Sequence, residues 1–193
     1  MSHLDFVRMF GRAIRRAKLP IAYSEGFNPH PLLTFALPLS VGYTSECEIL
    51  ELVLSEDVPS REVMERLNEV LPEGVKITGA KEGKSRMKSL DVALYVVYPE
   101  KVPDGISEFL QKEEILIEKK TKSGIKETDI RSDIKDIKIY INRIEMVLSA
   151  GSRANLKPEV VVNAMNKYIP GYCSGECEYH RKEIYTKDMD VIN

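Results

Sequence analysis

A proline- and glycine-rich stretch over residues 23–42, YSEGFNPHPLLTFALPLSVG, limits most strongly what this chain can fold into. Proline lacks an amide donor and fixes φ, and glycine usually marks a turn, so the first half of the stretch cannot be a helix. We therefore predict a shaped polar loop over residues 23–31, followed by a strand over Leu32–Val41 that Pro38 interrupts. A polar loop that leads into a buried strand is a typical place for a site.

The composition is that of an ordinary globular protein, with 43% hydrophobic and 30% charged residues among 193. No apolar run approaches the roughly 20 residues that a membrane-spanning helix needs, so we expect no membrane span. The start, MSHLD, lacks the features of a signal peptide, and three cysteines do not suggest a disulfide framework, so we expect a cytoplasmic protein. The net charge of −2 predicts no polyanion partner, so nucleic-acid binding would depend on local patches. We predict no cofactor.

The first half, residues 1–84, has the pattern of alternating helices and strands. Apolar residues at three- and four-residue spacing predict a helix over Ser2–Lys18, with Ser2 and Asp5 as a capping box. Two strands joined by a hairpin turn at residues 42–45 should follow, then a helix and a last strand. These later elements are predicted at Leu32–Val41, Glu46–Leu54, Pro59–Leu71 with Ser60 as its N-cap, and Val75–Ala80. The order α-β-β-α-β is that of a ferredoxin-like half without its N-terminal strand.

The second half, residues 89–193, is predicted to be a complete ferredoxin-like β-α-β-β-α-β unit with an insertion over Ser123–Asp136. A basic linker over residues 81–88 precedes it. The predicted elements are the strand Asp91–Tyr98, the helix Pro103–Lys112, the strand Glu114–Lys122, the strand or bent hairpin Ile137–Ser149, the helix Pro158–Tyr168 and the strand Glu178–Thr186. We therefore predict an α+β protein of two ferredoxin-like halves, the first lacking its N-terminal strand.

His30, held between Pro29 and Pro31, is the candidate catalytic residue. An imidazole that titrates near neutral pH can act as a general acid or base, bind a metal or contact a phosphate. The alternative is a loop histidine that hydrogen-bonds to backbone and holds the turn. The neighbouring binding candidates are Tyr23, Ser24, Glu25 and Asn28, together with His3 if the start of the first helix lies beside the loop.

Four arginines of the first helix are candidates for anion binding. They are Arg8, Arg12, Arg15 and Arg16. Together with the polar loop they could form a surface for RNA or nucleotide phosphates, supported by the basic residues 81–88 and by Lys119, Lys120 and Lys122. The alternative is a solvated helix face. The predicted sheets lack the aromatic-rich signature of RNA-recognition modules.

Cys173, Cys177 and His180 superficially resemble a metal-binding cluster. A zinc site would need a fourth ligand from Cys47 or His30, since thiolate and imidazole suit zinc. The spacing is not that of a standard zinc finger, and alternation along a strand explains it. We therefore predict no metal site. The chain also lacks a phosphate-binding glycine loop, a dinucleotide fingerprint, a His-Glu-x-x-His motif and a Gly-x-Ser-x-Gly elbow.

Four segments together resemble the radical-SAM-linked proteins that carry the DUF2344 domain. They are SHLD at residues 2–5, RAIRRA at 12–17, YSEGFNPHP at 23–31 and FALPLSVG at 35–42, with a weaker continuation at Asp129–Arg131. Such proteins occur alone or fused behind a cobalamin-binding radical-SAM enzyme. The resemblance therefore implies a radical-SAM enzyme as the partner, and it implies no assigned activity. Members usually begin with a further strand before the SHLD segment. This chain starts at Met1, so either that strand is missing or the first sheet is completed differently. A sheet without the strand would expose an unpaired edge to which another chain can add a strand.

Three hypotheses of function follow. The first is an accessory module that presents a substrate, with RNA as one candidate, to a radical-SAM enzyme through the loop and the first helix. The second is an RNA-modifying or hydrolytic enzyme that uses His30 as its acid or base. The third and weakest is a zinc-containing structural module.

Overall fold

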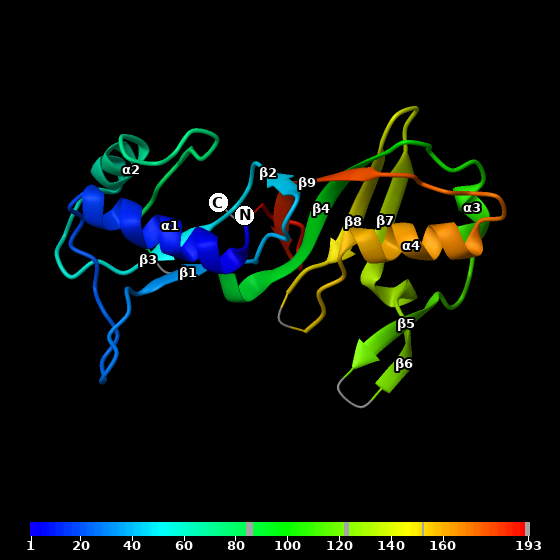
Figure 1. The fold of residues 1–193 in the computed structure, drawn as a ribbon, viewed down its shortest axis with the longest axis horizontal. Helices are drawn as coiled ribbons and strands as arrows, with labels where there is room; N and C mark the ends of the chain where they lie inside the picture. Colours follow the sequence, from blue (N-terminus) through cyan, green and yellow to red (C-terminus); the bar gives the residue numbers. More distant parts are fainter. Residues whose placement is uncertain (84–86, 122–123, 152, 192–193) are drawn as a thin grey trace. The chain divides into compact units, whose positions relative to one another are not determined.

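The computed structural model describes residues 1–83, 87–121, 124–151 and 153–191 (Figure 1). Two compact units are present: unit 1 comprises Met1–Val41 and Glu48–Ser85, and unit 2 comprises Gly42–Cys47 and Arg86–Asn193. Residues 84–86 of the predicted basic linker, Lys122 and Ser123 lie outside the described residues. The structure is mixed, with more extensive sheet than helix, which is compatible with the predicted α+β class. The prediction of two ferredoxin-like halves is not confirmed.

The described part of unit 1 contains two helices and a two-stranded antiparallel sheet. Helix α1 spans His3–Arg16, strands β1 and β3 span Leu33–Phe35 and Leu50–Leu52, and helix α2 spans Ser60–Asn68. Leu33 of β1 lies opposite Leu52 of β3. Apolar side chains from both helices and from the segment after α1 form the core of this unit. Its buried members are Ala13, Ile14, Ala17, Leu19, Ile21 and Leu67.

Helix α1 begins at its predicted cap. The Ser2 hydroxyl accepts a hydrogen bond from the Asp5 amide at 3.2 Å and donates one to the Asp5 carboxylate at 2.6 Å. This arrangement satisfies one of the free amides of the first turn. The apolar side of the helix packs through Phe6 and Phe10 against Phe35 of β1, with ring centroids 5.1 and 5.4 Å away. The predicted helix and its capping box are confirmed.

Helix α2 begins one residue after Pro59, which is its N-cap and makes no side-chain capping bond. The prediction that Ser60 is the cap is therefore wrong, because the extended backbone of Pro59 already leads the chain into the helix and Ser60 is its first residue. Beyond the other end of α2, Arg16 Nη2 donates to the carbonyl of Val70 at 2.7 Å. That contact satisfies a carbonyl that the helix leaves without an internal donor.

The predicted strand Val75–Ala80 is wrong, since residues 75–80 form no strand. The side chain of Asn68 supplies the hydrogen bonds that a neighbouring strand would give. Asn68 Nδ2 donates to the carbonyl of Ile77 at 2.9 Å, and the Ile77 amide donates to Asn68 Oδ1 at 2.8 Å. Ile77 itself packs against the core of unit 1. This segment is thus held to α2 as a coil rather than paired in a sheet.

The predicted hairpin turn at residues 42–45 contains strand β2, Tyr43–Ser45, which pairs with unit 2 and not with its sequence neighbours. Gly42 turns the chain with φ at 87°, a conformation that favours glycine. β1 and β3 do pair antiparallel, as the hairpin prediction requires, but each is only three residues long. The predicted strands are longer because no local pattern indicates that the chain leaves unit 1 between them.

Unit 2 is a five-stranded sheet in the order β2-β9-β4-β8-β7. β2 runs parallel to β9, and every other neighbouring pair in this sheet is antiparallel. The strands other than β2 are β4 at Leu90–Pro99, β7 at Ile134–Ile139, β8 at Ile144–Ser149 and β9 at Cys177–Thr186. The prediction of a strand or bent hairpin over Ile137–Ser149 corresponds to the hairpin of β7 and β8.

The helices of unit 2 are α3, Ile106–Leu110, and α4, Pro158–Tyr168; the bounds of α4 are those predicted. α4 lies across the sheet in Figure 1 and contributes the buried Val161 and Met165 to the core. Short 3-10 turns occur at Met87–Ser89 and Arg131–Asp133. Within the described ranges, no helix is both long enough and apolar enough to cross a bilayer.

A separate two-stranded hairpin pairs β5 at Leu116–Thr121 with β6 at Gly124–Asp129. β5 corresponds to the predicted strand Glu114–Lys122, but it pairs with β6 and not with the five-stranded sheet, and β6 lies within the predicted insertion. Its strands place like charges directly opposite one another: Glu118 faces Glu127, and Lys119 faces Lys126. Residues opposite one another in a ladder share a face, so each face of this hairpin carries a pair of one sign. Such like-charged cross-strand pairs are unfavourable.

We predict that Asn68→Ala lowers the free energy of unfolding by about 1–2 kcal/mol, because the amide and carbonyl of Ile77 lose their partners while still partly buried. Urea denaturation measures this change. Asn163→Ala, on an exposed position of α4, is the matched control and should stay within about 0.5 kcal/mol of the wild type. Equal effects of the two substitutions would contradict the role given to Asn68.

Candidate functional site

Residues 23–31 form a closed projection from unit 1, here called the finger. Tyr23 bridges Pro31 in antiparallel fashion, and the Ser24 amide donates to the carbonyl of His30 at 2.9 Å. Gly26, with φ at 117°, takes a conformation that other residues rarely adopt, which lets the chain reverse near the tip. The loop predicted here therefore has a defined shape.

Three backbone hydrogen bonds fix the base of the finger. The Ala22 amide donates to Val53, the Val53 amide to Leu32, and the Leu32 amide to Ala22, at 2.8 to 3.0 Å. Ile21, next to this ring, is buried in the core of unit 1. Because each of the three residues bonds to both of the others, the finger leaves the core from a fixed root.

Ser24 and His30 brace the finger across its width. Ser24 Oγ lies 2.8 Å from His30 Nδ1 and also accepts a hydrogen bond from the His30 amide at 3.1 Å. A serine beside a histidine can be a nucleophile with its base, but such a pair needs a third group that orients the imidazole. No residue in the described part of the chain hydrogen-bonds to His30 Nε2. The geometry is that of a side chain that holds the turn.

Phe27 lies near the tip and its side chain is fully exposed, at 106% of the reference area. Tyr23 is about half exposed, at 48%, and Glu25 and Asn28 are exposed as well. Sequence reasoning selected the polar residues and missed Phe27. The sequence feature that could have identified Phe27 as exposed is its position between Gly26 and Asn28, without an apolar partner at helix or strand spacing.

A shallow groove of about 240 Å³ lies at the base of the finger. Its lining is His30, Pro31, Leu32, Leu33, Thr34, Glu51 and Val53. Val53 is 45% exposed, so apolar surface continues from the finger onto the sheet. Enzyme and cofactor sites are usually deeper and enclose most of their ligand.

His3 packs against Phe35 instead of taking part in the finger's hydrogen bonds. The two rings meet edge to face with centroids 5.8 Å apart. His3 thus extends the aromatic cluster of Phe6, Phe10 and Phe35 at the start of α1. The contacts of His3 are those of a packing residue.

The four candidate arginines differ in their contacts. The Arg16 guanidinium donates a hydrogen bond to the carbonyl of Val70, so it already has a structural role within unit 1. Arg8, Arg12 and Arg15 recur at four- and three-residue spacing, so they share one exposed side of α1, here called the arginine row. Arg8 lies 3.4 Å from the exposed Asp5 carboxylate, and Arg15 bonds to the carbonyl of Gly11. Arg12 makes no ion pair or hydrogen bond with any described residue.

The weak metal candidates do not converge. Cys177 and His180 are three positions apart on β9, so their side chains point to opposite faces of the sheet. His180 Nδ1 lies 2.8 Å from Thr44 Oγ1, and its Nε2 lies 3.6 Å from the Glu46 carboxylate. Across the residues that the structure describes, no group of three or more His, Cys, Asp or Glu side chains could hold a metal ion.

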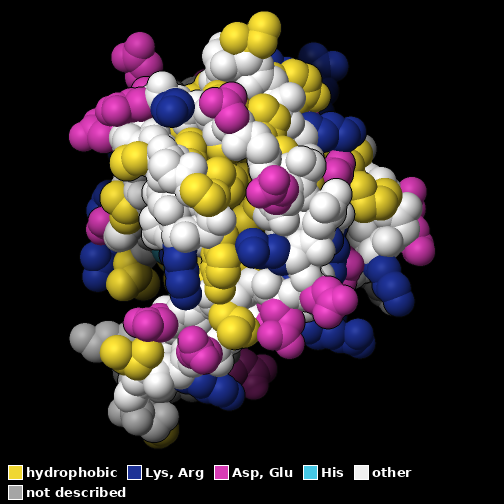
Figure 2. All heavy atoms as spheres, turned by 90° about the vertical axis from the view of Figure 1, so that its right-hand side faces the viewer, with side chains coloured by type: hydrophobic (Ala, Val, Ile, Leu, Met, Phe, Trp, Pro, Cys, Tyr) yellow, Lys and Arg dark blue, Asp and Glu magenta, His cyan; other side chains and the backbone are white. Residues whose placement is uncertain are grey.

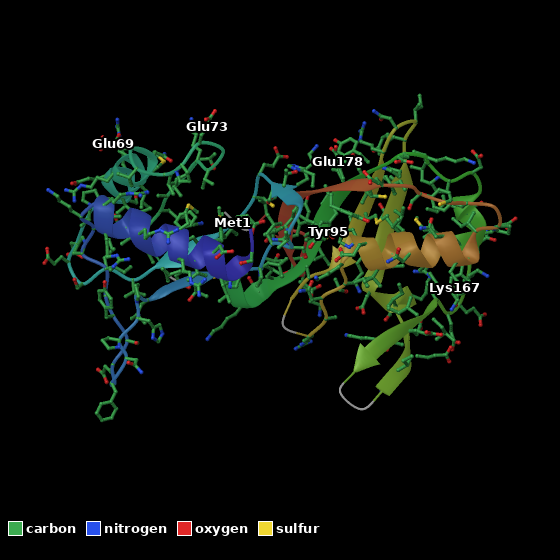
Figure 3. All side chains as sticks on the ribbon, viewed as in Figure 1. Met1, Glu69, Glu73, Tyr95, Lys167 and Glu178 are labelled. Carbon is green, nitrogen blue, oxygen red and sulfur yellow. The ribbon has the colours of Figure 1, made fainter. Side chains whose placement is uncertain are left out.

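Sequence reasoning also missed a cluster that fastens β2 to unit 2. The Tyr43 hydroxyl donates to the Glu159 carboxylate of α4, and the Tyr43 ring stacks on Tyr179 of β9 with centroids 4.9 Å apart. Tyr95 of β4, labelled in Figure 3, meets Tyr43 edge to face and lies 5.5 Å from the guanidinium of the buried Arg181. Tyr43 and Glu159 are 116 positions apart, so no local pattern could join them.

Burial raises the pKa of Glu159 above its usual value of 4.5. The Lys157 ammonium lies 3.6 Å away but is about half exposed, so it offsets this desolvation only weakly. Burial also raises the pKa of Tyr179, so its hydroxyl stays protonated at neutral pH. The cluster therefore combines three tyrosine rings, the buried Arg181 guanidinium and one carboxylate whose ionisation burial disfavours.

We predict that Glu159→Gln changes how stability depends on pH. Because folding raises the pKa of Glu159, the folded state holds more protons than the unfolded state from about pH 4.5 upward, and this group lowers stability as pH rises through that window. Glutamine keeps an acceptor for Tyr43 without ionising. The variant should gain stability relative to the wild type between pH 4 and pH 7 in urea titrations. The control is Glu178→Gln, at an exposed position of β9. A stability difference between Glu159→Gln and the wild type that does not vary with pH would contradict the prediction.

The face of unit 2 in Figure 2 mixes charges of both signs. Lys and Arg side chains lie among Asp and Glu side chains there, and neither sign covers the face. In unit 1, by contrast, the arginine row places three basic side chains along one side of a helix, and Asp5 pairs with the first of them. The arginine row is therefore the better candidate for a polyanion contact.

The family model described as "Uncharacterized protein conserved in bacteria (DUF2344)" matches residues 1–158 of the chain. This match covers most of the 193 residues, including the finger and the arginine row, so the chain belongs to the DUF2344 family. No curated protein and no solved structure matches it.

Proposed function

We propose that this DUF2344 protein is a non-catalytic accessory module that docks on a radical-SAM enzyme and presents a substrate to it. Its resemblance to radical-SAM-linked proteins supports the choice of partner. The shape of the finger supports the docking role. A cytoplasmic location belongs to the same proposal.

The observation that carries this proposal is that the finger is exposed and braced. Its polar groups, Ser24 and His30, bond to each other and not to a cavity where a substrate could react. An element that is already ordered before binding loses little conformational entropy when it binds. The groove beside it is shallow. This geometry suits recognition better than catalysis.

The strand order of unit 2 supports a ferredoxin-like assignment for that unit. The order β9-β4-β8-β7 is antiparallel throughout, with α3 between β4 and β7 and α4 between β8 and β9. β2 extends this arrangement at one edge, and the β5–β6 hairpin is inserted after α3. Proteins of this architecture serve many functions, so the assignment does not choose among them.

We expect a purified cobalamin-binding radical-SAM enzyme from the same cell to bind the full chain. Replacing residues 25–28 by two glycines should weaken binding by at least about tenfold, because the recognition element is lost while the base bonds of Ala22, Leu32 and Val53 remain. Biolayer interferometry measures the affinity, and thermal unfolding checks that unit 1 stays folded.

Absence of any complex with the wild type would contradict the accessory role. The competing enzyme hypothesis predicts a different result: His30→Ala would leave partner binding intact but remove an activity measured on the chain alone. The arrangement of Ser24 and His30, without a third orienting group in the described chain, favours the accessory role.

The arginine row favours RNA as the substrate that is presented. Three exposed guanidiniums on one helix side can contact successive phosphates, and Arg12 has no competing partner among the described residues. The acidic residues elsewhere in the chain limit this contact to a local patch.

We predict that Arg12→Glu weakens binding of a single-stranded RNA oligonucleotide at low salt by about tenfold, because one phosphate contact is lost and a repulsion is added. Filter binding over a range of salt concentrations should also show a shallower salt dependence. Arg61→Glu is the control: Arg61 is also exposed, on α2, but is paired with Glu65 at 2.8 Å. Equal losses from both variants, or no RNA binding by the wild type, would exclude this role.

A further inference from the structure

We propose that Phe27 is an anchor that inserts into an apolar pocket with a cationic rim on the partner protein. This inference rests on the proposed accessory function and names the feature that the partner must supply. It is carried by the exposure of Phe27, the rigidity of the finger and the charges around it.

The exposure of Phe27 has no explanation within unit 1. At 106% of its reference area, the ring touches neither the buried core of unit 1 nor the aromatic cluster of Phe6, Phe10 and Phe35. A large aromatic side chain that is left in water gains most when a partner buries it. Aromatic side chains are also enriched among the few residues that dominate protein interfaces.

The finger holds Phe27 in place before binding. Ser24 and His30 brace its width, and the ring of bonds among Ala22, Leu32 and Val53 fixes its base. Pro29 adds a fixed φ between the tip and the brace. Because the finger is already ordered, Phe27 loses little conformational entropy on binding. Most of the free energy gained by burying its ring therefore contributes to affinity.

The charges beside Phe27 indicate which charge the rim of the partner's pocket carries. Glu25 is the only formally charged residue of the finger at pH 7, with histidine neutral, and Glu51 is the charged residue that lines the adjoining groove. Both are acidic, so a complementary partner surface carries lysine or arginine around its pocket. The partly exposed Val53 extends the apolar contact from the tip to the groove.

The same charges argue against two other occupants. A nucleotide that stacked on Phe27 would bring its phosphate toward Glu25 and Glu51, which repel it. A second copy of the chain offers a pocket of about 170 Å³ in unit 2, whose lining includes Phe109, Tyr168 and Ile169. Asp104 and Glu108 also line that pocket, so its acidic rim would oppose Glu25. A different protein with a basic rim fits the finger better.

The test measures binding of the full chain and four variants to the same radical-SAM enzyme. Phe27→Ala should weaken binding by about 30-fold or more, mainly through faster dissociation. Phe27→Leu should stay within about fivefold of the wild type, since an apolar pocket accepts leucine whereas base stacking requires a ring. Glu25→Lys should weaken binding by about threefold, with a smaller effect at high salt.

Ile141→Ala is the matched control. Ile141 is also fully exposed, at 101%, in the turn between β7 and β8 of unit 2. This control should bind within about twofold of the wild type. All five proteins should unfold at the same denaturant midpoint, because neither Phe27 nor Ile141 contributes to a core.

Four outcomes would overturn the inference. Wild-type affinity in Phe27→Ala would overturn it while leaving the accessory function intact. A Phe27→Leu variant as weak as Phe27→Ala, with parallel losses of RNA binding, would show base stacking. A wild-type dimer that Phe27→Ala abolishes in sedimentation would identify a second copy as the occupant. No binding of the enzyme by the wild type would overturn the proposed function and this inference together.

Discussion

The pairing of β2 with β9 is the constraint on which the rest of the structure depends. Only Tyr43–Ser45 take part, but the Tyr43 hydroxyl and ring fasten this short strand to α4 and to Tyr179. β2 lies between β1 and β3 in the sequence, so the chain passes from unit 1 to unit 2 and back between these two three-residue strands. So short a sheet provides little support by itself. The finger therefore relies on the three bonds at its base and on its Ser24 brace.

Features set by neighbouring residues could be predicted from the sequence. The cap of α1 depends on Ser2 and Asp5, which are one helical turn apart, and α4 combines a proline in its first turn with a clear helical period. The finger is likewise local, since Gly26 and the prolines within residues 23–31 exclude a helix. Its hydrogen-bonding residues were recognised for the same reason, and the structure joins Ser24 to His30.

Features set by distant partners could not be predicted. Tyr43–Ser45 look like a turn, because their partners on β9 lie more than a hundred positions away. The pattern of residues 75–80 suits a strand, but the side chain of Asn68 takes the hydrogen bonds that a sheet would supply. Phe27 was overlooked because hydrophobic residues are usually buried, and the lack of an apolar partner at helix or strand spacing is only a weak sign of exposure.

The like-charged pairs of the β5–β6 hairpin have a consequence for the response of the chain to ionic strength. Dissolved ions screen the repulsion between Glu118 and Glu127 and between Lys119 and Lys126, so added salt strengthens this hairpin. The same ions weaken any attraction between the arginine row and a polyanion. The stability of the hairpin and the attraction of the arginine row for a polyanion thus change in opposite directions as salt is added. High ionic strength therefore favours the hairpin, and low ionic strength would favour any polyanion contact through α1.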